Sequence, residues 1–140
     1  MAAPKPLHVD VVAADRQVWK GDAVNIIIRT TEGDIGILPG HEPIFANLVP
    51  CAARIITDDG KQEVIAVDGG YVAVDDKGHV SILAQYASRS GEISREGAQQ
   101  DVDKISRMMD RNEFSEDDVH RLHLAQAQLL AAKHIAAQKD

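Results

Sequence analysis

The 140-residue sequence contains one cysteine and only five aromatic residues, namely one tryptophan, two tyrosines and two phenylalanines. Cys51 therefore has no partner for an internal disulfide, which is consistent with a reducing compartment. Basic residues are also scarce, because 15 lysines and arginines face 22 aspartates and glutamates, for a net charge of −7. This balance argues against a nucleic-acid partner and against direct docking on anionic lipid.

Long apolar runs are absent as well. No stretch approaches the roughly 20 apolar residues that span a bilayer. The start, MAAPKPLHVD, lacks the apolar segment of a secretory signal. We therefore expect an acidic, soluble, intracellular protein without a lipid anchor.

The composition changes near residue 91. All five prolines lie in the first 50 residues, and Gly97 is the one glycine after Gly91. The later part is rich in Ala, Gln, Leu and charged residues, which favour helix. The sequence therefore predicts a β domain over residues 1–88 and a helical domain over residues 92–140, an α+β fold class.

Short strands separated by turn residues are predicted in the first part. Residues 7–11 alternate between apolar and polar, and residues 24–29 are rich in β-branched side chains. Two hairpins are expected, the first joining 52–57 to 62–67 and the second joining 71–74 to 79–84. Strands at this spacing are typical of a sandwich or barrel.

Two helices in an antiparallel hairpin are predicted for the second part. Ala98, Val102, Ile105 and Met109 form one apolar stripe. A second helix is expected from the capping box at Ser115 and Asp118 to about residue 138. It carries two stripes, of which the first comprises Leu122, Ala125, Leu129, Ala132 and Ala136, and the second Leu124, Ala127, Ala131 and Ile135. Since one partner helix cannot cover both, one stripe is expected to meet the sandwich or another protein.

Catalytic and metal-binding patterns are lacking. His41-Glu42 has no second histidine four residues on, and Pro43 opposes a helix there. His120 and His123 share a helix face, but two solvated histidines are the expected state. We predict no catalytic residue, no metal site and no cofactor.

Residues 32–43, EGDIGILPGHEP, resemble the signature of the epsilon subunit of F-type ATP synthases, which reads acid-Gly-x-x-Gly-Ile-x-Pro-Gly-His-x-Pro. The opening strand at 7–12, the step Val67-Asp68-Gly69-Gly70-Tyr71 and the strand at 80–84 also resemble that family. The resemblance covers nearly the whole chain. It implies an antiparallel β-sandwich of about ten strands followed by an antiparallel two-helix hairpin.

The same resemblance implies a non-catalytic subunit of the central stalk. In the family this subunit binds gamma, touches the rotor ring of c subunits and couples proton flow to ATP synthesis. Residues 32–43 are expected to form a stiff glycine-rich loop on the ring side, with Glu32, Asp34 and His41 as candidate contacts. Because the sequence opens without a presequence, we expect the cytoplasmic face of a bacterial plasma membrane.

The helical part is the regulatory arm of the family, which folds on the sandwich or extends toward the catalytic subunits and restrains ATP hydrolysis. The resemblance implies that basic side chains of the arm meet acidic segments of the alpha and beta subunits. The candidates, for each of which a solvated surface residue is the alternative, are Arg107, Arg111, Arg121 and Lys133.

An alternative function is a nucleotide-sensing module that binds ATP between sandwich and arm. Family members with this property carry Ile/Leu-Asp-x-x-Arg-Ala. Here Ser94 replaces the acid and Gly97 the arginine. Loss of both charges is expected to abolish useful ATP affinity, although Arg95 lies nearby.

Overall fold

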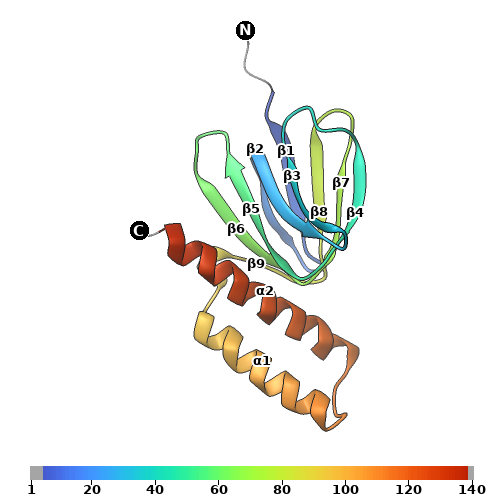
Figure 1. Ribbon diagram of the computed structural model, residues 1–140, viewed down its shortest axis with the longest axis vertical. Coiled ribbons are helices and arrows are strands. Elements are labelled where there is room, and N and C mark those ends of the chain that lie inside the picture. Colours follow the sequence, from blue (N-terminus) through green and yellow to red (C-terminus); the bar gives the residue numbers. More distant parts are fainter. Residues whose placement is uncertain (1–4, 139–140) are drawn as a thin grey trace.

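The computed structural model describes residues 5–138, which form nine strands, a short 3₁₀ turn and two helices (Figure 1). In Figure 1 the strands make a sandwich at one end of the molecule and the helices lie at the other. The strands are β1 (Leu7–Val12), β2 (Gln17–Thr30), β3 (Gly33–Ile37), β4 (Ile44–Leu48), β5 (Cys51–Thr57), β6 (Gln62–Val67), β7 (Gly70–Val74), β8 (His79–Leu83) and β9 (Ala87–Arg89). The helical elements are η1 (Ser90–Glu92), α1 (Arg95–Asp110) and α2 (Glu116–Gln138).

The strands follow the order β1-β8-β7-β4-β2-β5-β6-β9, with β3 paired to β2. An additional pairing of β1 with β2 closes β1, β8, β7, β4 and β2 into a ring. Every pair is antiparallel except β1 with β8, which is parallel. No hairpin joins these two strands, so no tight turn fixes their relative direction. The α+β sandwich-plus-hairpin fold class is confirmed, and the parallel pair is a departure from a purely antiparallel sheet.

Strand β2 is longer than the predicted strand at 24–29 because it serves both layers. Residues 17–23 pair with β1, residues 26–30 pair with β3, and Ala23 and residues 25–27 pair with β5. The register shifts between Ala23 and Asn25, which lets the strand bend from one layer to the other. Pairing with β1 thus overrides the weak strand propensity of Gly21 and Asp22.

Residues 33–37, expected within a glycine-rich loop, are instead strand β3. Gly36 pairs with Ile27 and has no positive φ, so it is an ordinary strand residue. Gly33 and Gly40 flank the strand with φ of 119° and 87°, conformations that glycine adopts without strain. The stiff element of this segment is therefore a paired strand between two glycine turns.

The core lies inside the sandwich, with alternate residues of β1 (Leu7, Val9 and Val11) all buried. Strand β6 is buried on both faces, which explains its unbroken apolar run. Ile65 and Val67 face the sandwich core, whereas Val64 and Ala66 pack on α2.

Helix α2 lies between the sandwich and α1 (Figure 1). Its stripe of Leu124, Ala127, Ala131 and Ile135 packs on β5 and β6. The other stripe, with Leu122 and Ala125 buried, is left for α1. The two-stripe prediction therefore resolves into one face for the sheet and one for the partner helix.

The helix ends follow their capping chemistry. The predicted capping box is confirmed, because Asp118 N–H donates to Ser115 Oγ at 3.2 Å and Ser115 N–H donates to Asp118 Oδ2 at 2.9 Å. Asn112, with φ of 56°, ends the first helix in the left-handed region. Neither described helix is long and apolar enough to cross a membrane.

Candidate functional site

The three candidates from the family signature fall into two groups. Glu32 lies in the turn between β2 and β3, and Asp34 lies near the start of β3, both exposed. His41 lies in the loop 38–43 beyond the far end of β3. A five-residue strand spans roughly 17 Å, so the structure keeps Glu32 and Asp34 together and places His41 at the opposite end. That loop is at the end of the sandwich far from the helices (Figure 1).

The turn that carries Glu32 is held by a buried side chain. Thr30 Oγ1 donates to Gly33 O at 2.8 Å and accepts from Glu32 N–H at 3.1 Å. Thr30 is one of the few buried polar residues of the described chain. The Glu32 carboxylate is therefore an exposed negative charge on a fixed backbone.

Asp34 is paired with Arg29 across the β2–β3 hairpin. Arg29 Nε donates to Asp34 Oδ1 at 2.7 Å, and this hydrogen bond lowers the pKa of Asp34. Both residues line a small cavity of about 150 Å³ together with Leu130 and His134 of α2. Asp34 thus lies at the edge of the contact between sandwich and arm.

Around His41 the surface is unusually apolar. Leu38 and Phe45 are 55% and 66% exposed, and Phe45 lies against Tyr71 with ring centroids 4.9 Å apart. The ring of His41 donates from Nδ1 to the carbonyl oxygen of Glu42 at 2.7 Å. Sequence analysis missed Phe45, although the alternating exposure along β4 would place it outside.

The basic candidates of the arm lie on its exposed surface. Arg121 pairs with Asp117 at 3.1 Å and Arg111 with Glu113 at 3.5 Å. Arg107 and Lys133 have no carboxylate within 4.0 Å among the residues that the structure describes. These two charges are available to a partner without breaking an existing ion pair.

The arm is held on the sandwich by a buried carboxylate that the sequence did not reveal. The Asp68 side chain is 2% exposed, accepts from Tyr86 N–H at 3.0 Å and pairs with His120 Nδ1 at 2.8 Å. The Tyr86 hydroxyl also donates to Asp117, which raises the pKa of Tyr86. The expectation of a merely solvated His120 is therefore wrong, because the fold brings Asp68 beneath it.

The two positions at which this sequence departs from the ATP-binding motif, Ser94 and Gly97, lie at the start of α1. Ser94 is the N-cap, and its Oγ accepts from Gly97 N–H at 3.1 Å. An open groove of about 560 Å³ beside them is lined by Ile93, Arg95 and Lys133. Ser94 and Gly97 thus supply a helix cap and no charge.

Helix α2 is expected to dock less firmly as the pH falls, through His134. Burial, and secondarily the charge of Arg54, lower the pKa of His134. Undocked His134 therefore binds protons at higher pH than docked His134, so docking weakens as the pH falls through about 6.5. Arg54 Nε is itself buried without a hydrogen-bond partner among the described residues, so a second cation there is poorly accommodated.

Amide hydrogen exchange of α2 at pH 7.5 and 5.5 measures this effect, after correction for the intrinsic rates. His134→Gln, which cannot be protonated, is expected to lose less protection than the unmodified chain. His123→Gln on the same helix is the matched control. Equal losses in the His134→Gln variant and the unmodified chain would contradict the prediction.

Comparison with known proteins agrees with the sandwich fold and with the signature at residues 32–43. Residues 6–90 match the family described as ATP synthase, Delta/Epsilon chain, beta-sandwich domain. The chain is 57% identical over 142 residues to an ATP synthase epsilon chain of Cutibacterium acnes, covering 96% of this chain and 97% of that protein. It is 40% identical over 126 residues to that of Streptomyces coelicolor, covering 90% and 94%.

Among solved structures, a chain from the Euglena gracilis mitochondrial ATP synthase, in a structure of OSCP, F1 and c-ring, shares the fold. Its TM-score is 0.70 at 22% identity, covering 98% of this chain and 84% of that chain. The signature at residues 32–43, the sandwich and the full-length similarity all agree. The chain belongs to the family of ATP synthase epsilon chains, which are subunits of that complex other than its catalytic ones.

Proposed function

We propose that this chain links the gamma subunit to the ring of c subunits in a proton-translocating ATP synthase, so that proton flow is coupled to ATP synthesis. The observation that carries the proposal is 57% identity across 96% of the chain to an ATP synthase epsilon chain. The similar fold from an assembly of F1 and c-ring supports it. The bacterial relatives favour the cytoplasmic face of a bacterial plasma membrane.

Two ends of β3 are proposed as contacts within the stalk. Glu32 and Asp34 at one end present carboxylates on a backbone that Thr30 and the β2–β3 pairing hold in place. His41 at the other end is accompanied by the exposed Leu38 and Phe45. A rigid, paired strand between them suits an element that transmits torque, since it does not flex under load.

The arm is proposed to restrain ATP hydrolysis. Its contact with the sandwich centres on Ala127 and Ala131, which pack on Val64 and Ala66, with Leu124 and Ile135 beside them and a few polar bonds. An arm that docks and releases needs the two states to differ by only a few kcal/mol, and alanines contribute little apolar area each to the docked state. Released, the arm offers Arg107, Arg111, Arg121 and Lys133 to acidic segments of the alpha and beta subunits.

The test is ATP hydrolysis by the complex reconstituted with the full chain or with a chain stopped after Ser90. This point separates the two proposed domains, 1–88 and 92–140. Removal of the arm is expected to raise hydrolysis several-fold, because the restraining element is lost. Co-purification with the other subunits is the control for assembly.

Two other outcomes would contradict part or all of the proposal. Equal hydrolysis by both assembled complexes would remove the restraining role and leave the coupling role to the sandwich. Failure of the full chain to assemble with gamma and the c subunits would overturn the proposal as a whole.

A further inference from the structure

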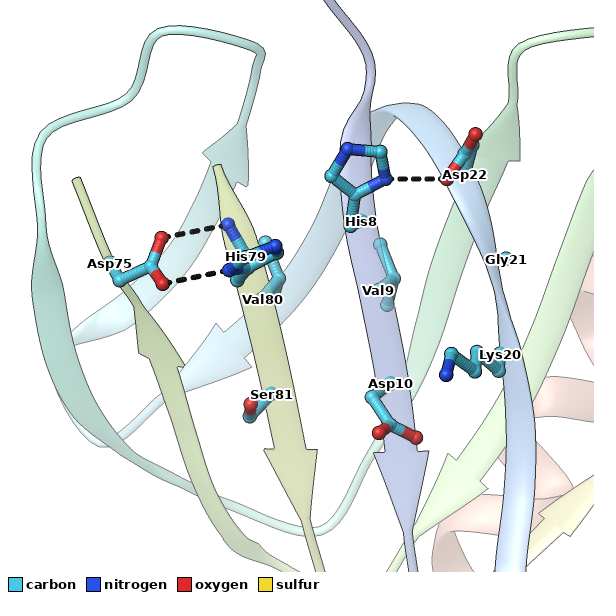
Figure 2. Close-up of a pocket in the computed structure, with 10 residues that line it drawn as sticks. All are labelled: His8, Val9, Asp10, Lys20, Gly21, Asp22, Asp75, His79, Val80 and Ser81. Carbon is cyan, nitrogen blue, oxygen red and sulfur yellow. Dashed lines mark hydrogen bonds and ion pairs between the residues drawn. The ribbon is translucent and has the colours of Figure 1, made fainter. Parts of the chain in front are cut away.

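Two histidine–aspartate pairs meet at the end of the sandwich far from the helices (Figure 2). His8 of β1 and His79 of β8 are direct neighbours in the parallel strand pair. Their ring centroids are 5.5 Å apart, with an angle of 46° between the ring planes. Both rings line an open hollow of about 740 Å³. The sequence gives no signal for this meeting, because the two residues lie far apart along the chain.

Each ring is held by its own carboxylate. His8 Nδ1 donates to Asp22 Oδ1 at 2.8 Å, and His79 Nδ1 donates to Asp75 Oδ2 at 3.0 Å. Asp75 is fixed in turn, because it also accepts from the backbone N–H of His79 at 2.9 Å. A carboxylate on Nδ1 places the proton there and leaves the lone pair on Nε2.

The Nε2 atoms are free to bind a ligand. Neither has a hydrogen-bond partner within residues 5–138. Figure 2 shows that the second ring nitrogen of each histidine lies on the side away from its aspartate, so the two free nitrogens occupy the space between the aspartates. Carboxylate–imidazole pairs with a free Nε2 are the usual arrangement of histidine ligands to transition metals.

The ring spacing matches that of two imidazoles on one metal ion. With a metal–nitrogen distance of about 2.1 Å and tetrahedral geometry, two bound rings have centroids roughly 5.3 Å apart. The observed 5.5 Å is close to this spacing.

We propose that His8 and His79 bind a divalent transition-metal ion of the zinc class, with Asp22 and Asp75 as supporting carboxylates. No three His, Cys, Asp or Glu side chains of the described residues are placed to hold a metal together, so water completes the coordination. Imidazole donors favour zinc, nickel and copper over magnesium and calcium. The metal site does not rest on the proposed function, because it is argued from residues that are not among the proposed stalk contacts.

Titration calorimetry of the tag-free full chain with Zn²⁺ alone tests the site. One ion per chain is expected to bind, with a parallel rise of the melting temperature. H8Q and H79Q are each expected to lower the affinity at least about tenfold, as are D22N and D75N through the loss of a supporting carboxylate. H123Q, on the arm, is the matched control and is expected to bind like the unmodified chain.

Imidazole ¹⁵N spectra give a second measurement that does not depend on variant stability. Zn²⁺ is expected to shift the Nε2 signals of His8 and His79 and to leave the other histidines unchanged. The proposal is overturned if no saturable binding is seen at millimolar Zn²⁺. It is also overturned if H8Q and H79Q both bind as the unmodified chain does, or if other histidine signals shift instead.

Discussion

Replacing Gly70 by alanine is expected to destabilise the sandwich by about 2–5 kcal/mol, the sum of a backbone and a packing penalty. Gly70 has φ of 103°, a conformation that side chains with a Cβ rarely adopt. An added Cβ would also lie 1.9 Å from the carbonyl oxygen of Leu83, which is backbone and cannot rotate away. Such a loss is a large share of the 5–15 kcal/mol that stabilises an ordinary domain.

The matched control is Gly78→Ala. Gly78 also has a positive φ, of 82°, but an added Cβ there meets nothing within 4 Å. Only the backbone penalty applies, about 1–2 kcal/mol. Urea unfolding followed by circular dichroism measures both. Equal losses in the two variants would show that the contact with Leu83 relaxes and carries no cost.

Replacing Ala131 by aspartate is expected to detach α2 from the sandwich. Ala131 is fully buried against Val64 and Ala66, so a carboxylate placed there would lose its water of hydration. An unpaired buried charge costs several kcal/mol, and release of the helix avoids that cost. The polar bonds of His120, Gln128 and Asp117 to the sandwich oppose release only in part, because each contributes about 1 kcal/mol net.

Methyl NMR signals of Val64 report the result, since this side chain lies under the helix. They are expected to move toward the values of an exposed valine in Ala131→Asp. Ala136→Asp introduces the same residue at an exposed position of the same helix and is expected to leave them in place. Unchanged Val64 signals in Ala131→Asp would mean that the helix stays docked.

The signature residues have distinct physical roles in the structure. In the step Val67-Asp68-Gly69-Gly70-Tyr71, Gly69 and Gly70 adopt positive φ, and Asp68 supplies the buried acceptor for His120. In the segment 32–43, Gly33 and Gly40 turn the chain while Gly36 pairs within β3. The segment predicted to be one stiff loop thus contains both turn and strand positions.

The local elements of this protein were determined by its sequence alone. These elements depend on residues only a few positions apart, so pattern and propensity suffice to predict them. They are the hairpins around Gly60 and Gly78, the capping box of Ser115 and Asp118, and the apolar stripes of α2. Tertiary structure alone decided the rest. The other features join segments that are distant in the sequence. They are the parallel pairing of β1 with β8, the bend of β2, the contact of His8 with His79 and the burial of Asp68 beneath His120. Local periodicity says which face of an element is buried, but not against which other element, because that depends on how the whole sheet closes.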